Sequence, residues 1–431
     1  MVGPTTYYRP EFEGELSEST KSLIHRRNQV LGAPYRLFYR HPITPVSAQG
    51  ATITDVDGRV FLDAYNNVAV VGHNHPKVVE AVSRALGTLN THTRYLHEAI
   101  VDYSEILLAS FPEHLNRVVY TCTGSEANDL ALRVAREATG NRGIIVTNYA
   151  YHGVTAATAD ISPSLVGGGR IPDHVELLSS PAHYEDWGAE IERAIDALSS
   201  RGHGVSALLL DTVFASDGLW PRGAMEKLDD GIAQAVGVVK KAGGLVIADE
   251  VQAGFGRVGE SFWGFPGRFE PDIVTLGKPM GNGYPVAAVV ASEDLFDRFS
   301  ESARYFNTFA GTQAAVAAAQ ATWDVLHTEG LPQHATQMES YLRASFSEIA
   351  RHPRVGAVRG VGLYWTVDFV TENGDPDEAA ALRVVNAMRD EGILIAASGP
   401  TNSSLKIRPP LVITEEQLDG LVSTLGAALV T

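Results

Sequence analysis

The sequence has almost no cysteine, because Cys122 is the only one in 431 residues. An intrachain disulfide is therefore impossible, and the composition fits a reducing compartment rather than a secreted scaffold. No apolar run approaches the roughly 20 residues that a membrane-spanning helix needs. Residues 1–20 also lack the basic and apolar regions of a signal peptide. We expect a cytoplasmic protein that does not associate with membranes.

Positive charge is also scarce, since 34 lysines and arginines stand against 51 aspartates and glutamates, for a net charge of −17. A surface of this sign repels nucleic acid, so we expect none as a partner. Any anionic ligand must be held by a few local groups. His73 and His75 are two residues apart, but no cysteine, carboxylate or H-E-x-x-H pattern accompanies them, and we predict no metal site.

Two short apolar runs in the middle of the chain end next to chemically active residues. Residues 245–248 stop at Asp249, and residues 273–276 stop one residue before Lys278. Such runs are typical of buried strands in a parallel sheet, and ligands bind beyond the carboxyl ends of these strands. The pattern predicts a carboxylate and an amine facing one crevice. Pyridoxal phosphate needs that pair: a lysine that holds its aldehyde as a Schiff base, and an acid on its ring nitrogen.

A strand, a Gly-Ser turn and a helix follow one another further upstream. Residues 118–120 predict the strand, Gly124 and Ser125 lie in the turn, and apolar residues at helical spacing continue to Ala135. Free N–H groups and the positive end of the helix dipole would point at an anion there. Taken alone, the turn could be an ordinary serine cap. Beside the carboxylate and the amine, we predict that Gly124 and Ser125 bind the phosphate of the cofactor.

Residues 247–259 (IADEVQAGFGRVG) and 275–289 (TLGKPMGNGYPVAAV) resemble the cofactor segment of the class III (omega) aminotransferases, which are pyridoxal phosphate enzymes of fold type I. The resemblance covers about residues 25–425. It implies that Lys278 forms the Schiff base and that Asp249 holds the pyridine nitrogen. It also implies further cofactor contacts: Val251 packed on the ring, Gln252 near the phenolic oxygen, Tyr151 stacked on the ring face, and Thr308 reaching the phosphate across a homodimer interface.

The alternation of strands and helices between about residues 115 and 295 predicts an α/β fold with a mostly parallel, doubly wound sheet. With the resemblance, this gives a fold type I pyridoxal phosphate transferase. We expect an N-terminal arm and small-domain meander over residues 1–65, a large cofactor-binding domain over residues 66–330, and a small α+β domain over residues 331–431.

Several other segments resemble one branch of the family, the ethanolamine-phosphate and phosphohydroxylysine phospho-lyases. They are residues 65–76, 89–97, 160–163 and 277–283. The resemblance implies a phospho-lyase that converts phosphoethanolamine-like amines to an aldehyde, ammonia and phosphate. The alternative is an omega-aminotransferase that passes an amino group to pyruvate or another keto acid. A non-catalytic binding protein is a third hypothesis, and the intact lysine and aspartate argue against it.

An enzyme that eliminates phosphate needs cations for a dianion, and Arg94 and Arg408 are the candidates for substrate binding. The family segment that matches residues 92–96 lines the site of the partner subunit, although Arg94 could also be an ordinary surface arginine. Arg408 could instead bind a carboxylate, as in transaminases, and the phospho-lyases tend to have lysine at this position. Asp211 replaces a glutamate that pairs with the substrate arginine in many aminotransferases. Its shorter side chain should reach less well, which favours the phospho-lyase.

Overall fold

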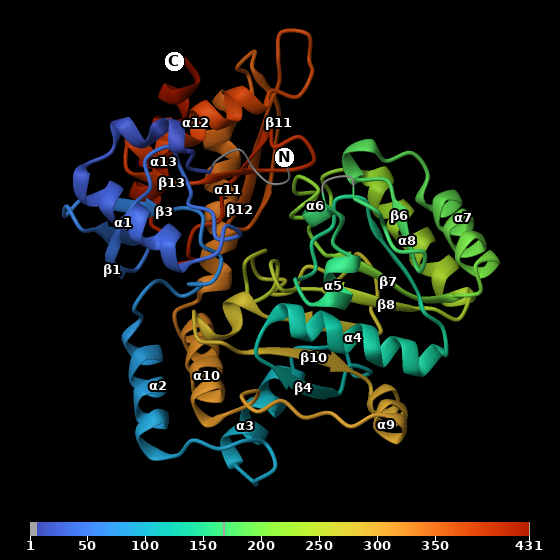
Figure 1. The fold of residues 1–431 in the computed structure, drawn as a ribbon. Coiled ribbons are helices and arrows are strands. Elements are labelled where there is room, and N and C mark those ends of the chain that lie inside the picture. Colours follow the sequence, from blue (N-terminus) through green and yellow to red (C-terminus); the bar gives the residue numbers. More distant parts are fainter. Residues whose placement is uncertain (1–6, 167–168, 431) are drawn as a thin grey trace.

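Seven strands form the central sheet, in the order β4-β10-β9-β8-β7-β5-β6 (Figure 1). The five strands from β9 to β6 are parallel to one another, and β10 is antiparallel to both of its neighbours, β4 and β9. The predicted α/β fold with a mostly parallel sheet is confirmed. The strand bounds are Arg117–Thr121 (β4), Gly143–Thr147 (β5), Val175–Leu178 (β6), Val205–Asp211 (β7), Leu245–Asp249 (β8), Ile273–Leu276 (β9) and Ala287–Ala291 (β10).

Helices cover both faces of this sheet, because successive strand residues point to opposite sides. Ile144 of β5 packs with α4 and α9 in one hydrophobic cluster, whereas Ile145 belongs to a second cluster with α7, α8 and α10. This is the doubly wound arrangement. The helix bounds are Gly124–Thr139 (α4), Trp187–Ser200 (α7), Glu226–Lys241 (α8), Glu293–Ser302 (α9) and Gln313–Thr328 (α10).

The two ends of the chain pack together in a second, smaller part of the molecule (Figure 1). One sheet has the order β1-β2-β3-β13, so a C-terminal strand pairs in parallel with the N-terminal meander. The other has the order β11-β12-β15-β14. The strands are Pro45–Gln49 (β1), Thr52–Asp55 (β2), Val60–Asp63 (β3), Val355–Val361 (β11), Tyr364–Phe369 (β12), Ile393–Leu394 (β13), Ala396–Ser398 (β14) and Ser404–Lys406 (β15).

The computed structural model describes residues 7–166 and 169–430, so residues 1–6 of the predicted arm lie outside it. In the described part of the chain, no helix is both long and apolar enough to cross a bilayer. The remaining helices are Pro10–Glu15 (η1), Glu18–Val30 (α1), Pro76–Thr88 (α2), Glu98–Leu108 (α3), Ala156–Asp160 (α5), Pro163–Val166 (α6), Pro181–His183 (η2), Lys278–Gly281 (η3), Leu331–Ile349 (α11), Glu378–Asp390 (α12) and Glu415–Val430 (α13).

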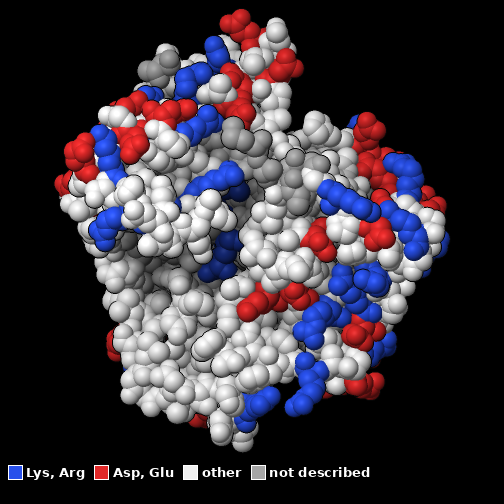
Figure 2. Space-filling view, in the orientation of Figure 1, with Lys and Arg blue, Asp and Glu red and all other residues white. Residues whose placement is uncertain are grey.

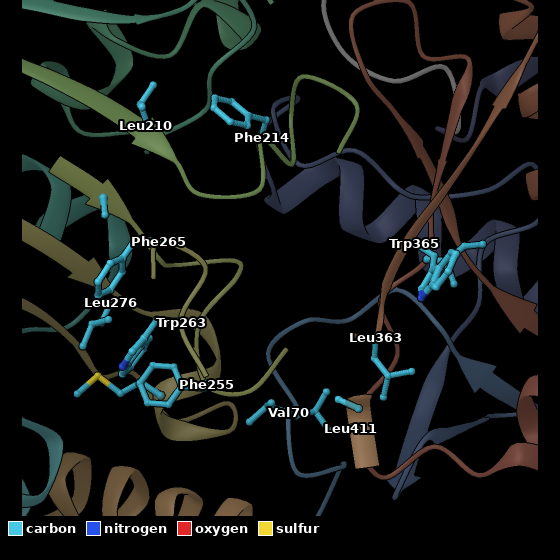
Figure 3. Packing of buried hydrophobic residues seen from close by; sticks show 14 of the residues in the cluster. Val70, Leu210, Phe214, Phe255, Trp263, Phe265, Leu276, Leu363, Trp365 and Leu411 are labelled. Carbon is cyan, nitrogen blue, oxygen red and sulfur yellow. The ribbon is translucent and has the colours of Figure 1, made fainter. Parts of the chain in front are cut away.

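Aromatic packing fixes the long loop between β8 and β9 (Figure 3). The rings of Phe255 and Trp263 meet edge to face with centroids 5.1 Å apart, and Phe111 stacks on Trp263 at 4.7 Å. These side chains are buried, and each such aromatic pair contributes about 0.5–1.5 kcal/mol beyond its area burial. The loop therefore leaves the end of β8 in one fixed direction, and that end begins the candidate site.

Candidate active site

A cleft of about 710 Å³ opens where the carboxyl ends of the parallel strands meet the smaller part of the molecule. Figure 2 shows a hollow there with lysine or arginine side chains inside it. The lining includes Tyr151 after β5, Gln252 after β8, Lys278 after β9, Lys406 at the end of β15 and Arg408 two residues beyond it. The cleft thus lies beyond the carboxyl ends of the strands, where ligands bind in open α/β sheets, and both parts of the molecule contribute to it.

Asp249 is buried at the end of β8, and its carboxylate accepts three hydrogen bonds. Asn128 Nδ2 and His152 Nδ1 donate to Oδ2 at 2.9 and 2.7 Å, and the N–H of Val251 donates to Oδ1 at 3.0 Å. Burial alone would raise the pKa of this carboxyl. The hydrogen bond and charge of His152, with the nearby charge of Lys278, outweigh burial and hold the pKa below its ordinary value. Asp249 is therefore an anion at neutral pH.

Lys278 follows β9 and faces the same cleft. Its φ of 28° lies in the left-handed region, where a side chain with a Cβ is strained, and such strain concentrates at functional sites. Burial and the charge of Arg408 lower the pKa of the ammonium to about 8, against the opposing effect of Asp249. Its amine is accordingly easier to deprotonate than that of an exposed lysine, which suits Schiff-base and proton-transfer chemistry.

The N-terminus of α4 lies directly beside Val251 and Gly277. A Cβ on Gly124 would lie 2.8 Å from Val251 Cγ1, and a Cβ on Gly277 would lie 3.2 Å from the Cα of Gly124. Thr123 and Glu126 form a capping box. Gly124 and Ser125 come next, and their N–H groups have no acceptor among the residues that the structure describes. The glycines allow three segments to meet at a helix N-terminus with free donors, the geometry that binds phosphate.

Gln252 and Arg408 form a pair in the cleft wall. Arg408 Nη1 donates to Gln252 Oε1 at 2.6 Å, and its Nε donates to the carbonyl of Tyr65 at 2.8 Å. The guanidinium also lies 4.8 Å from the Tyr65 ring centroid. Gln252 therefore orients the arginine, while our sequence interpretation gave it only a cofactor contact.

Asp211 does not reach Arg408, because both of its oxygens accept backbone donors from its own turn. The N–H of Val213 bonds Oδ1 at 3.0 Å and that of Ala215 bonds Oδ2 at 3.1 Å. Burial and the charge of Asp249 raise the pKa of this carboxyl. No ion pair joins Arg408 to a carboxylate within residues 7–166 and 169–430. The cation remains available to a ligand.

Arg94 and Thr308 lie outside the cleft of their own chain. Both are exposed, and the Arg94 guanidinium lies over the ring of Phe306, 4.0 Å from its centroid. Their predicted roles require a second subunit, since nothing in the described part of the chain brings them to Lys278.

Three residues of the site were missed by sequence reasoning. His152 lies within the Tyr-His-Gly segment that we used only for Tyr151, and Asn128 is one helical turn beyond Gly124; both hold Asp249. Lys406 lines the cleft beside Arg408. The signal for Lys406 was present: it stands two residues from Arg408 on an extended segment, and such residues share a face.

These residues fit pyridoxal phosphate on structural grounds. Asp249 is a buried anion suited to a protonated ring nitrogen, Lys278 is an amine of lowered pKa, and Gly124 and Ser125 offer free N–H groups for a phosphate. Tyr151 lines the same cleft with its ring half-buried. By contrast, no group of three or more histidine, cysteine, aspartate or glutamate side chains in the described residues is placed to hold a metal ion.

Comparison with known proteins extends across nearly the whole chain. The family model described as aminotransferase class III matches residues 38–429. An ethanolamine-phosphate phospho-lyase homologue of Caenorhabditis elegans is 34% identical over 445 residues, covering 95% of this chain and 94% of that protein. An alanine–glyoxylate aminotransferase 2-like protein of Drosophila melanogaster is 36% identical over 428 residues, covering 93% and 85%. A phospholyase from Arthrobacter, solved in complex with phosphoethanolamine, is 40% identical with a TM-score of 0.89 and covers 95% of this chain and 99% of that one.

The packing of Gly124 against Val251 predicts the effect of one added methyl group. Gly124→Ala should raise the dissociation constant for pyridoxal phosphate at least tenfold and destabilise the fold by about 1–3 kcal/mol. The side chain of Val251 is short and β-branched, so it cannot rotate away from the new methyl group, and the backbone must shift instead. Cofactor titration followed by absorbance, and thermal unfolding, measure both. Gly237→Ala in α8 is the control, since no atom lies within 4 Å of its Cβ. Unchanged cofactor affinity in Gly124→Ala would show that this helix N-terminus is not the phosphate site.

Proposed function

The chain belongs to the class III aminotransferase family, and from that premise we propose that it is a pyridoxal phosphate-dependent phospho-lyase acting on phosphoethanolamine or a similar phosphorylated amine. The products are an aldehyde, ammonia and inorganic phosphate. Two similarities support this reaction: the 40% identity with the Arthrobacter phospholyase and the 34% identity with the C. elegans phospho-lyase homologue. The cofactor, when bound, supplies an electron-accepting ring that stabilises a carbanion on the substrate.

The residues of this chain divide the remaining work. In the proposed reaction Lys278 Nζ removes the proton from the substrate carbon that bears nitrogen, and its lowered pKa suits it to act as the base. Asp249 keeps the ring nitrogen protonated, and Asn128 and His152 keep Asp249 in place. Gly124 and Ser125 would hold the cofactor phosphate, and Tyr151 and Val251 would pack against its ring.

The observation that favours a phospho-lyase over a transaminase is the set of hydrogen-bond partners of Arg408. In the proposed active site it faces the cleft with no carboxylate partner among the described residues, because Asp211 is held by its own turn. A transaminase must bind two different substrates in turn, and an arginine that a nearby acid can neutralise or release suits that exchange. An arginine that stays fixed and unneutralised suits one anionic substrate.

The first experiment incubates the enzyme, loaded with pyridoxal phosphate, with phosphoethanolamine and no keto acid. We expect catalytic release of acetaldehyde and inorganic phosphate in equal amounts, because elimination needs no amino-group acceptor. A coupled dehydrogenase assay measures the aldehyde and a colorimetric assay the phosphate. No release, together with alanine formation when pyruvate and a simple amine are supplied, would establish the omega-aminotransferase instead.

Lys278→Ala tests the assignment of the base and the covalent anchor. Turnover should fall by at least about 10⁴-fold, since both the covalent attachment and the proton transfer are lost. The cofactor should still bind through the α4 N-terminus and Asp249, without the absorbance of the lysine-linked form. Lys241→Met, an exposed lysine at the end of α8, is the control and should keep full activity. Substantial residual activity in Lys278→Ala would exclude this lysine.

We also propose that the protein acts as a homodimer in the cytoplasm. Large apolar side chains are exposed together on α2, on residues 89–97, on α3 and around residue 308, and Figure 2 shows few charges over this region. They are Val79, Leu86, Leu89, Tyr95, Leu96, Val101, Phe306 and Phe309. A second copy of the chain would cover this face. It would also carry Arg94 and Thr308, which lie on the same face, to the partner's cleft.

Phe309→Asp should weaken the dimer, because it places a charge in a desolvated apolar interface. Light scattering should show the wild type at twice the chain mass of 46.3 kDa and the variant shifted toward a single chain at micromolar concentration. Its activity should fall in parallel, since the partner's Thr308 and Arg94 are lost with the interface. Val56→Asp, on the exposed β2–β3 turn, is the matched control. A dimer of unchanged stability in Phe309→Asp would contradict this interface.

A further inference from the structure

The cleft is unusual in its charge. Its lining contains four cationic side chains, Arg36, Lys278, Lys406 and Arg408, and no aspartate or glutamate of the described chain belongs to it. The whole protein carries a net charge of −17, so this is a local reversal of sign. One of the four is the proposed Schiff-base lysine. The other three exceed what the cofactor needs, because its phosphate is assigned to the α4 N-terminus.

Lys406 and Arg408 present their cationic groups on one side of an extended segment. Between them Ile407 is fully buried and exchanges two backbone hydrogen bonds with Trp365, at 2.8 and 3.0 Å. Leu405 is equally buried. The period of two in extended backbone therefore turns residues 405 and 407 to the core and residues 406 and 408 to the cleft. The N–H of Arg408 also bonds the carbonyl of Ala64 at 2.8 Å, which fixes the segment along the N-terminal meander.

The two cations are in different bonding states. Arg408 donates from Nε to the Tyr65 carbonyl and from Nη1 to Gln252, and its Nη2 makes no hydrogen bond to a described residue. The Lys406 ammonium has neither a hydrogen bond nor an ion pair with any described residue, although the side chain is half-buried. Its charged neighbours are Arg408, Lys278 and Asp211, and burial followed by Arg408 lowers its pKa to about 7. Two like charges crowded at a cleft wall are stabilised by a bound anion.

We propose that Lys406, together with the unbonded Nη2 of Arg408, binds the leaving phosphate of the substrate and selects phosphorylated amines over plain ones. This role rests on the proposed phospho-lyase activity. A monoester phosphate carries nearly two negative charges at neutral pH and offers three acceptor oxygens. Two adjacent cations match that charge, whereas a carboxylate needs only one. Neither the family resemblance nor the similarity to known proteins assigns a role to Lys406.

The same pair also stabilises the negative charge that forms when the C–O bond to phosphate breaks. Lys278 takes the proton from the carbon that bears nitrogen, a carbon–carbon double bond forms, and the C–O bond to phosphate breaks with its electron pair left on the phosphate oxygen. A proton from water completes the released phosphate, and water converts the two-carbon fragment to aldehyde and ammonia. Negative charge on the leaving oxygen grows as the bond breaks, so cations fixed beside it lower the barrier. Lys406 should therefore affect both the KM and the kcat of the elimination.

The test compares Lys406→Met, Lys406→Arg and the surface control Lys241→Met, all loaded with pyridoxal phosphate. Lys406→Met keeps an unbranched apolar stem and removes the charge. Its kcat/KM for phosphoethanolamine should fall about 10- to 100-fold, the usual effect of losing a hydrogen bond to a charged group. Its reaction with ethylamine, followed as the absorbance change of the bound cofactor, should change less than threefold. Lys406→Arg should recover most of the elimination, because the guanidinium restores the charge.

Inhibition by inorganic phosphate reports binding at this site and does not depend on how fast each variant turns over. The inhibition constant of phosphate should rise at least tenfold in Lys406→Met and stay close to the wild-type value in Lys406→Arg and Lys241→Met. Equal losses with phosphoethanolamine and ethylamine, or no change in phosphate inhibition, would overturn the role of Lys406. Wild-type enzyme that releases no phosphate would overturn the proposed function itself, and with it this inference. Melting temperature and cofactor absorbance verify that each variant is folded.

Discussion

The structure depends above all on keeping one ionised carboxylate out of water. Asp249 is buried at the end of β8, whose last four residues are all buried, and an isolated charge there costs several kcal/mol of desolvation. Three donors offset that cost, and each comes from a different segment: Asn128 from α4, His152 from the turn after β5, and a backbone N–H just beyond β8. Stabilising the charge therefore fixes the helix and both loops around it.

Further hydrogen bonds connect the groups around Asp249 to one another and to β9. Asn128 accepts a hydrogen bond from Thr275 on β9 at 2.7 Å and donates another to the carbonyl of His152 at 2.8 Å. β9 ends next to Lys278, so the strand that carries the amine is tied to the helix that carries the phosphate donors. Buried polar networks of this kind are costly when one member is missing, because each group that bonded to it is left without that partner away from water. The acid, the amine and the phosphate cradle are thus positioned as one unit.

Sequence patterns predicted the site residues whose positions follow from the strand or turn next to them in the sequence. Apolar runs that end at Asp249 and at the residue before Lys278, and the turn at Gly124, each reveal a strand end or helix start within a few residues. Lys406 was signalled only by its spacing of two from Arg408, and its place in the cleft depends on how the three-residue β15 pairs with β12 and β14, which no local pattern predicts. Asn128 was hidden for another reason: its amide looks like any polar position on an amphipathic helix until Asp249, 121 residues away, comes to lie beside it.

The site has one set of residues suited to the cofactor and another set suited to the substrate. This separation explains how one family can run different reactions. In the proposed mechanism, Asp249, Lys278 and the α4 N-terminus would hold the cofactor whose ring stabilises a carbanion, and elimination and transamination share that step. What happens next depends on the charge around the neighbouring carbon, and here the smaller part of the molecule supplies it through β15. With Asp211 bound to its own turn, nothing in the described chain neutralises Arg408. In the proposed enzyme, a substrate with a phosphate on that carbon would meet fixed positive charge as the C–O bond breaks, whereas a plain amine would gain nothing from it. The side chains at residues 406 and 408, rather than those that would hold the cofactor, would then select the reaction.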